Sequence, residues 1–388
     1  MNSMTNIRRR LARAAVGVVA VTAIAAGLGA CAAGGSGSTD AADGGLTPLK
    51  VGVLPYLDYH LFYVAHEMGF DKELGYDMSF TKFPLEPNET QSLARGDIDI
   101  AQGAIGSLVS QLPSQQDLRV FLSLSQYKGF AFVVREDSGL KTYQDYLDEL
   151  GDPDKAREAV VEEMVGKSLL TTESSYRATI AGLMDEGGKT YDDLNVQNFA
   201  EASQGAAAFI QGTGDIYLGA VAQTVKLVDQ MDGYEVLIQD EEMGAPGLWY
   251  SNAYVTQDYL DANRQQLVDV TAIWYRTARY VAENPDEAYP IILKTLNPDT
   301  ASNLTVDDLK SQIPDTTYFP TAEEAQELTY NDDSDLSWKA LTDYQFEQAQ
   351  ALGTDLSGIT PDEFIVQDEI FDEFMADQDL QDYVAAPF

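Results

Sequence analysis

Tyrosine and aspartate side chains gather in one short segment after the first apolar run of the chain. Residues 55–60 carry Tyr56, Asp58 and Tyr59. Tyrosine rings stack on flat ligands and their hydroxyls form hydrogen bonds, so Tyr56 and Tyr59 are candidate ligand contacts. Asp58 either joins them or caps the helix that follows. The chemistry predicted for this segment is recognition of a small molecule.

Other candidate contacts lie where predicted strands end or predicted helices begin. Small residues at 102–104 would let a ligand approach the backbone, or would simply allow tight packing. Ser174 and Ser175 open a predicted helix, whose free N–H groups suit an oxyanion or carbonyl; plain capping is the alternative. The further candidates are Gln102, Gly103, Ala104, Tyr127, Ser174, Ser175, Tyr176, Gly219, Gln223, Trp249 and Asn252.

Catalytic and metal-binding motifs are sparse. Ser125 and Lys128 match a Ser-x-x-Lys pattern, but the Ser-Asp-Asn and Lys-Thr-Gly elements that accompany it in penicillin-binding proteins are missing. His60 and His66 have the wrong spacing for one metal-binding helix face, and Cys31 is the sole cysteine. We therefore expect no enzyme, no metal and no cofactor. A hydrolase working with paired carboxylates stays open, because the chain has 63 Asp and Glu.

The order of predicted elements indicates an α/β fold. Short apolar or alternating runs are interleaved with helical patterns, which favours a largely parallel sheet. Strands are expected at 49–54, 76–83, 96–101, 120–124, 130–134, 166–170, 196–199, 214–220, 236–239 and 249–256. Helices are expected at 61–68, 89–95, 176–186, 205–211 and 265–283, with a helical, acidic tail that wraps one lobe.

A Gly-Asp-Ile unit occurs at 96–98 and again at 214–216, each time after a short helix. The matching order of flanking elements predicts two similar α/β lobes joined by two hinge strands, with a ligand cleft between them. The predicted organisation is a signal peptide at 1–30, a flexible tether at 31–47, a first lobe from 48–134 and 250–388, and a second lobe at 135–249.

The N-terminus indicates export. Four arginines precede an uncharged apolar stretch at 14–30, and the sequence LGAC at 28–31 is similar to a bacterial lipobox. This predicts lipidation of Cys31 and anchoring to the outer face of a cell membrane. The net charge of −39 excludes a nucleic-acid binder, which would need a basic footprint.

Four segments in this order resemble the solute-binding proteins of ABC importers. They are LKVGVLP at 49–55, RGDIDIA at 95–101, FVVREDSGLKT at 132–142 and ENPDEA at 283–288. The resemblance is to the alkanesulfonate, taurine and nitrate group, which also contains binders of the thiamine pyrimidine precursor. It implies a type II periplasmic binding protein fold, a monomer, hinge closure on a small molecule, and delivery to a permease with a cytoplasmic ATPase.

The ligand class follows from the loops predicted to border the cleft. These loops are rich in tyrosine, and Lys128 and Arg177 are the basic residues near them. A planar heteroaromatic or an uncharged-to-cationic ligand is favoured, with an alkanesulfonate, taurine or nitrate as the alternative. A surface hydrolase or a scaffold lipoprotein would be a different class. The acidic insert at 143–164 and the long tail depart from the family pattern and are interpreted as solvated surface.

Overall fold

The computed structural model describes residues 45–127, 129–247, 249–334 and 336–388. The predicted signal peptide, Cys31 and most of the predicted tether lie outside these residues. The tether was expected to reach residue 47, but the first strand, β1 (Thr47–Val53), already begins there. Among the described residues, no helix is both long enough and apolar enough to cross a bilayer.

The first lobe contains two sheets. β1 pairs in parallel with β2 (Tyr76–Lys82). The four-stranded sheet has the order β11-β4-β10-β3, and all its described pairs are antiparallel. Its strands are β3 (Ala101–Ala104), β4 (Leu118–Tyr127), β10 (Trp249–Thr256) and β11 (Thr317–Tyr318).

The second lobe contains one five-stranded sheet, in the order β7-β6-β8-β5-β9. β6 is parallel to β7 and β8, whereas β5 is antiparallel to β8 and β9. The strands are β5 (Ala131–Arg135), β6 (Ser168–Thr171), β7 (Asn195–Asn198), β8 (Ile216–Leu218) and β9 (Tyr234–Gln239). The expected largely parallel sheet is therefore wrong, because the strands that enter and leave the second lobe run against their neighbours.

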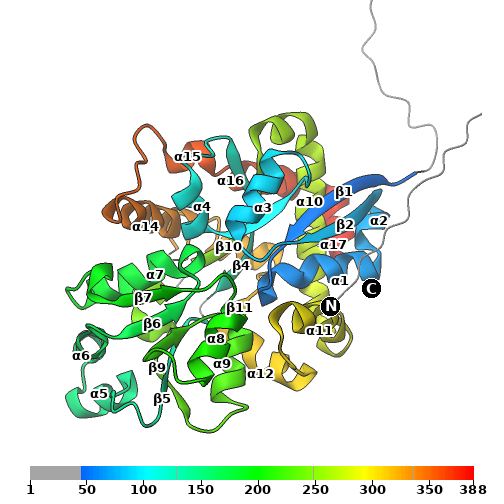
Figure 1. Ribbon diagram of the computed structural model, residues 1–388. Coiled ribbons are helices and arrows are strands. Elements are labelled where there is room, and N and C mark those ends of the chain that lie inside the picture. The colour runs from blue at the N-terminus through cyan, green and yellow to red at the C-terminus, as the bar shows by residue number, and fades with distance from the viewer. Residues whose placement is uncertain (1–44, 128, 248, 335) are drawn as a thin grey trace, which may run out of the picture. The chain divides into compact units, whose positions relative to one another are not determined.

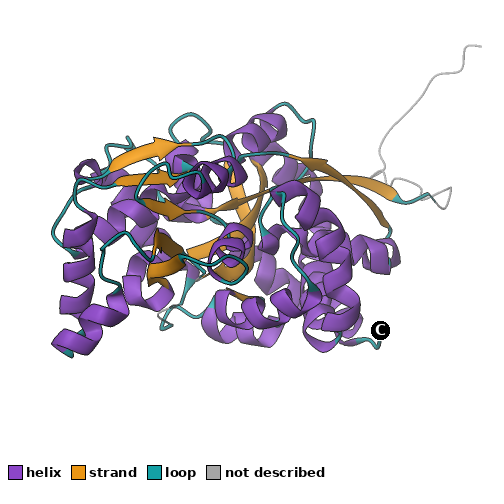
Figure 2. Cartoon of the chain, turned by 60° about the horizontal axis from the view of Figure 1, so that its bottom comes forward, coloured by secondary structure: helices purple, strands orange, loops and turns teal. Residues whose placement is uncertain are grey.

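Helices cover the strands from both sides in Figure 2. In the first lobe, the central helix is α10 (Gln257–Glu283), whose Trp274 is fully buried and donates from Nε1 to the carbonyl oxygen of Leu124 at 3.1 Å. The other helices of this lobe before the tail are α1 (Leu61–Met68), α2 (Phe70–Glu73), α3 (Glu86–Ala94), α4 (Ile105–Gln111), α11 (Pro285–Thr300) and α12 (Val306–Thr316).

The second lobe's helices flank its sheet in Figure 1. They are α5 (Tyr143–Leu150), α6 (Pro153–Met164), α7 (Glu173–Glu186), α8 (Ala202–Ile210) and α9 (Val221–Val228). The helices α1, α7 and α8 agree with the sequence prediction to within a few residues. The strand expected at 96–101 is wrong in position: β3 starts only at Ala101, because the preceding residues form a turn that returns to Lys50.

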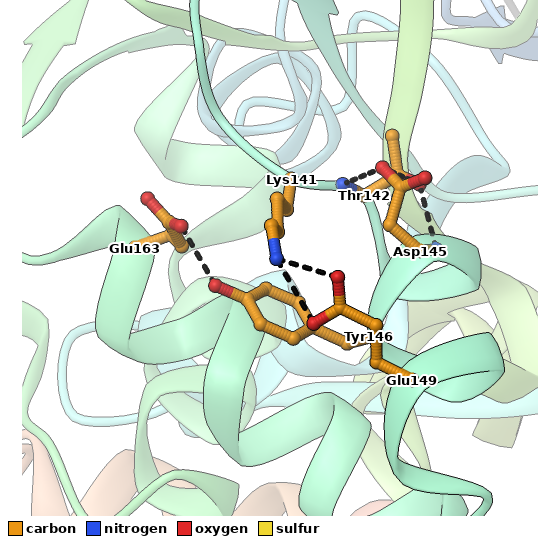
Figure 3. A network of polar contacts seen from close by, with 6 residues as sticks. All are labelled: Lys141, Thr142, Asp145, Tyr146, Glu149 and Glu163. Atoms are coloured by element: carbon orange, nitrogen blue, oxygen red, sulfur yellow. Dashed lines mark hydrogen bonds and ion pairs between the residues drawn. The ribbon is translucent and has the colours of Figure 1, made fainter.

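The insert at 143–164 forms α5 and α6, and several of its acids contact nearby side chains (Figure 3). Lys141 Nζ lies 2.6 Å from Glu149 Oε1, and the Tyr146 hydroxyl donates to Glu163 Oε1 at 2.7 Å. Thr142 and Asp145 form a capping box at the start of α5. These contacts fit the interpretation of the insert as a solvated face.

The C-terminal tail reaches both lobes, which corrects the expectation that it wraps only one. Its helix α14 contacts both α4 and α7, which belong to different lobes (Figure 1). The last helices, α16 and α17, pack on α10. The tail helices are α13 (Ala322–Leu328), α14 (Trp338–Ala351), α15 (Pro361–Phe364), α16 (Gln367–Ala376) and α17 (Gln378–Ala385).

Candidate functional site

A pocket is formed by residues of both lobes, beside the loop that follows β1. β1 ends at Val53, Pro55 breaks the strand, and residues Leu57–His60 form a buried 3-10 turn. The first lobe contributes Tyr56, Asp58, Tyr59, Glu86, Tyr127 and Ser251, and the second lobe contributes Tyr176 together with residues of α9.

Asp58 is a buried carboxylate at this pocket. Its side chain is held by Ser125, whose hydroxyl donates to Oδ2 at 3.3 Å, and by the hydroxyl of Ser251. Ser125 and Ser251 face each other in register on β4 and β10. Burial raises the pKa of Asp58 to about 6, although the two hydroxyl hydrogen bonds act in the opposite direction. Asp58 is thus predominantly ionised at neutral pH, inside the pocket.

Glu86 is a second buried acid that lines the pocket. It opens α3, where a carboxylate is favoured by the helix dipole and by free N–H groups. Its Oε1 accepts a hydrogen bond from the backbone N–H of Ala104 at 3.1 Å, so its position is fixed against β3. The pocket therefore presents two carboxyl groups from different elements.

Aromatic rings form much of the remaining surface. Tyr56 and Tyr59 pack edge to face with ring centres 5.9 Å apart. The Tyr127 ring packs edge to face on Phe130 at 4.9 Å, and Phe130 packs in the same way on Tyr176 at 5.9 Å. The chain of rings from Tyr127 to Tyr176 spans the crossing from β4 to β5, so the two lobes share one aromatic cluster.

No Lys, Arg or His occurs among the described residues that line this pocket. Arg177, one of the two basic residues considered from sequence, places its guanidinium over the ring of Tyr191, 4.5 Å from the centroid. Lys128, the other, lies outside the described residues. Within the described part of the chain, the charge at the pocket is thus supplied by acids.

A second hollow adjoins the pocket, and Pro55 and Tyr56 line both. It is more polar and contains the ion pair between Lys82 Nζ and Asp299 Oδ1 at 2.7 Å. Gln223 also lines it and donates from Nε2 to the carbonyl oxygen of Thr300 at 3.0 Å.

Five of the candidates from sequence meet in the first pocket: Tyr56, Asp58, Tyr59, Tyr127 and Tyr176. Gln223 lines the second hollow. Ser174 and Ser175 lie in the first turn of α7, and Trp249 begins β10. The side chains of these three candidates are outside the described part of the chain.

The remaining candidates have structural contacts instead. Gln102, Gly103 and Ala104 lie inside β3 and not in a loop, and Gln102 donates from Nε2 to the carbonyl oxygen of Gly52 at 2.9 Å. Asn252 is buried in β10 and donates from Nδ2 to the carbonyl oxygen of Tyr250. Gly219 lies directly before the pocket residue Ala220, and a side chain at Gly219 would overlap the Tyr217 hydroxyl. Gly219 thus allows close packing there.

Several lining residues were missed from sequence. Glu86 precedes a proline, a signal of a helix start, but the helix was expected to begin at Glu89. Ser251 lies between two named candidates and carried no motif of its own. Three leucines from the region after 294 also line the pocket, namely Leu296, Leu304 and Leu309.

One group of metal-ligand types occurs in the described residues, at His66, Asp71 and Asp77. Asp71 Oδ2 is already engaged by His66 Nδ1 at 2.7 Å and by the backbone N–H of Met78 at 2.9 Å. These contacts give the cluster a structural role between α1 and β2.

Comparison with known proteins places this geometry in a family. None of the curated proteins searched matches the sequence significantly. Among solved structures, the periplasmic aliphatic sulphonate-binding protein SsuA from Escherichia coli is 16% identical with a TM-score of 0.61, covering 84% of this chain and 99% of that one. The periplasmic nitrate-binding protein NrtA from Synechocystis PCC 6803 is 13% identical with a TM-score of 0.62, covering 87% and 91%.

A third structure, the ligand-binding component of an ABC-type import system from Staphylococcus aureus with zinc bound, is 12% identical with a TM-score of 0.60, covering 84% and 98%. These likenesses establish the two-lobed periplasmic binding protein fold. The model of the NMT1-like family matches residues 42–294, which is more than half of the sequence. The chain belongs to the NMT1-like family.

Proposed function

We propose that this protein is the extracytoplasmic solute-binding component of an ABC importer and that its ligand is a small organic cation. Its family and fold support the transport role. The ligand class rests on one observation: the pocket combines the buried carboxyl groups of Asp58 and Glu86 with tyrosine rings and, in its described lining, no basic residue.

Carboxylates and aromatic rings both attract cations. A ring face carries negative electrostatic potential, and a desolvated cation–π contact contributes up to ~2 kcal/mol. A charge-assisted hydrogen bond to a carboxylate such as Asp58 is about twice as strong as a neutral one. Protonated aminoheterocycles meet both requirements, and the aminopyrimidine precursor of thiamine belongs to this class. Quaternary ammonium ions carry no N–H, so they can use the rings and the charge of Asp58 but form no hydrogen bond with it.

An anion is the rival ligand, because SsuA and NrtA are named as binders of aliphatic sulphonates and of nitrate. An anion at this pocket would face the ionised carboxylate of Asp58, and like charges at short range repel strongly in a low-dielectric site. The pocket of this chain therefore favours a different ligand class from the one named for those two proteins.

Thermal shift and calorimetry against two panels test the ligand class. One panel contains tetramethylammonium, 4-aminopyridine and the aminopyrimidine precursor of thiamine, and the other contains methanesulfonate, taurine and nitrate. We expect saturable binding from the first panel only. Binding from the anion panel alone would overturn the proposal.

Asp58→Asn is the informative variant, because it removes the charge and keeps the shape. We expect it to weaken the binding of protonated 4-aminopyridine, which can donate N–H to Asp58, by roughly 10-fold to 100-fold, the range for a hydrogen bond to a charged group. Asp97→Asn is the matched control: it removes one acid whose side chain is 58% exposed and away from the pocket, and affinity should stay the same.

Hinge closure is the mechanism that we propose for delivery. A ligand that contacts both Asp58 and Tyr176 would favour the form in which the lobes are together, and a permease would bind that form. Small-angle scattering should show a smaller radius of gyration at saturation with the ligand, and an unchanged radius would contradict closure.

We further propose that the protein is a monomer, held at the outer face of the membrane by lipid on Cys31. In a bacterial expression host, Cys31→Ser should move the protein from the membrane fraction to the soluble fraction. An unchanged membrane fraction would refute the anchor. Analytical ultracentrifugation of the soluble variant would test the monomer.

The lobes that we propose are close to those expected from sequence, at 48–134 with 250–388 and at 135–249. The sheet pairing favours an earlier first crossing, because β5 already pairs with β8 and β9 of the second lobe. Hydrogen exchange of the ligand-free protein tests this placement: the amides of β5 should exchange together with those of β8 and β9, and exchange together with those of β4 would contradict it.

A hydrolase using Asp58 and Glu86 is the alternative of another class. We propose that the protein has no enzymatic activity and needs no cofactor. After incubation with the purified protein, the bound ligand should be recovered chemically unchanged by mass spectrometry, and conversion of the ligand at a catalytic rate would support the hydrolase instead.

A further inference from the structure

Residues beyond the family-matched region form one wall of the pocket. The family model ends at residue 294, yet Leu296, Leu304 and Leu309 line the pocket together with Asp58 and Tyr176. All three leucines are buried. They come from the end of α11, from the loop that follows, and from α12, so two helices and a loop combine to place them.

The loop between these helices is held by side-chain hydrogen bonds. Asn297 Oδ1 accepts from the N–H of Leu304 at 2.9 Å, and Asn297 Nδ2 donates to the Leu304 carbonyl oxygen at 2.9 Å. Ser302 donates to the same Oδ1 at 2.7 Å. Thr305 and Asp308 then form a capping box that starts α12. Leu304 is thus fixed in place, as a specificity-determining contact requires.

The wall is also tied to the second lobe. Gln223 of α9 donates to the carbonyl oxygen of Thr300 at 3.0 Å, and both groups are buried. Val221 and Val225, on the same helix as Gln223, line the pocket with the three leucines. An apolar surface from both lobes therefore lies in the same pocket as the two carboxyl groups.

We infer that Leu296, Leu304 and Leu309 are specificity-determining residues that select an apolar substituent on the bound cation. The inference rests on the proposed function for the charged head of the ligand. A compact cation without a substituent would gain no contact with the leucine wall. A substituent that covers the wall adds roughly 4-fold in affinity per buried methylene, which corresponds to ~0.8 kcal/mol.

A chain-length series measures this selection directly. The probes are alkyltrimethylammonium ions in which one alkyl group grows from methyl to butyl. For the wild type we expect the dissociation constant to fall roughly 4-fold per added methylene until the wall is covered. A dissociation constant that does not change with chain length would overturn the inference.

Variants of Leu304 assign the effect to the wall. Leu304→Asn keeps the approximate size and makes the surface polar, so the gain per methylene should fall below 2-fold, while Leu304→Met should keep it. Leu304→Phe fills space and should shift the best chain to a shorter one, which provides a second readout if Leu304→Asn does not fold. Wild-type chain-length dependence in Leu304→Phe and in any folded Leu304→Asn would overturn the inference.

Neutral isosteres separate this inference from the proposed function. In these probes a tert-butyl group replaces the trimethylammonium group, with the same alkyl series attached. Suppose that cations bind no better than these isosteres, but both series lose their chain-length dependence in Leu304→Asn. The cation proposal would then be wrong, and the inference about the three leucines would be supported. If the wild type binds cations more tightly than the isosteres but shows no dependence on chain length, the inference about the three leucines is wrong and the cation proposal is supported.

Discussion

Asp99 and Asp215 make the same pair of backbone contacts in the two lobes. Asp99 Oδ2 accepts from the N–H of Lys50 at 2.8 Å, and the N–H of Asp99 donates to the Lys50 carbonyl oxygen at 2.8 Å. Asp215 does the same with Ser168, at the same two distances. Each aspartate thus joins the turn after a helix to a strand of its own lobe, β1 for Asp99 and β6 for Asp215.

The preceding turns match as well. After α3, Gly96 has a φ of +74° and the N–H of Asp97 returns to the Ser92 carbonyl oxygen. After α8, Gly212 has a φ of +90° and Thr213 returns to Ala208. Both are helix ends of the Schellman type. The repeat expected from sequence is present in the structure, but its alignment was displaced by two residues. The sequence repeat paired Asp97 with Asp215, whereas Asp99 is the structural counterpart of Asp215.

Substitution of these aspartates tests the corrected alignment. Asp99→Ala and Asp215→Ala each remove the acceptor of a backbone N–H and should lower the free energy of unfolding by ~1–3 kcal/mol. Asp97→Ala removes an exposed acid and should change it by less than ~0.5 kcal/mol. Urea denaturation measures all three. A larger loss in Asp97→Ala than in Asp99→Ala would restore the original alignment.

The buried carboxyl group of Asp58 predicts a pH dependence of stability. Its folded-state pKa of about 6 exceeds the ordinary value of 3.8, so the folded protein binds more protons than the unfolded chain between these pH values. The contribution of Asp58 is therefore fully present below about pH 4 and is lost as pH rises through 6. A shift of this size corresponds to on the order of 3 kcal/mol.

Asp58→Asn should remove this dependence. Without ligand, the variant should gain stability relative to the wild type as pH rises from about 4 to 7, with a gain of up to ~3 kcal/mol. Urea denaturation at pH 4, 5, 6 and 7 measures it, with Asp97→Asn as the control that should follow the wild type. A constant difference across this range would refute the titration of Asp58.

The loop at 55–60 that lines the pocket could be predicted from sequence, whereas much of its surroundings could not. A strand that ends at a proline and leads into Tyr56, Asp58 and Tyr59 marks a loop at the carboxyl end of a strand, where ligands bind in α/β folds. This is a local signal. No local signal marks Ser251. It contacts Asp58 only because β10 pairs with β4, and these strands are far apart in sequence.

Tertiary packing explains the other misses. Leu304 and Leu309 look like any core leucines, and their place at the pocket depends on how α12 and the loop before it pack on α11. Gln102 illustrates the converse: it follows a Gly-Asp-Ile turn and looks like a loop residue, but β3 starts one residue before it and pairs with β10. The repeated order of strands and helices therefore predicted the two lobes, and only the pairing of strands fixed which residues line the pocket.

Gly52 is predicted to be intolerant of a side chain. A Cβ at this position would overlap Glu89 Oε1 and lie 2.8 Å from the Ile98 side chain. Glu89 is buried and its Oε1 accepts from the N–H of Gln102 at 3.0 Å, so displacement would break this bond. Gly52→Ala should lower the free energy of unfolding by ~1–3 kcal/mol.

Gly205→Ala is the matched control for Gly52→Ala. Gly205 lies inside α8, and its added Cβ would meet the Tyr217 ring at 3.3 Å, an approach that small shifts relieve. The higher helix propensity of alanine, worth ~1 kcal/mol, offsets that contact. Chemical denaturation should show a clear loss for Gly52→Ala and little change for Gly205→Ala; equal losses would contradict the close packing on Glu89.

The contact of α14 with α7 can be measured as a coupling between Gly182 and Tyr344. A side chain at Gly182 would overlap the Tyr344 hydroxyl and lie 2.9 Å from Pro246 Cγ. The Tyr344 hydroxyl is buried with no hydrogen-bond partner among the described residues, so Tyr344→Phe should cost less than ~1 kcal/mol. Gly182→Ala should cost ~1–3 kcal/mol by overpacking.

The double variant, which combines Gly182→Ala with Tyr344→Phe, measures this coupling. Removal of the hydroxyl makes room for the new methyl group, so Gly182→Ala should cost at least ~1 kcal/mol less in the Tyr344→Phe background. Urea denaturation of the wild type, both single variants and the double variant gives the coupling. Strict additivity would show that α14 does not pack on α7 in solution, and the tail would then leave the two lobes free of each other on that side.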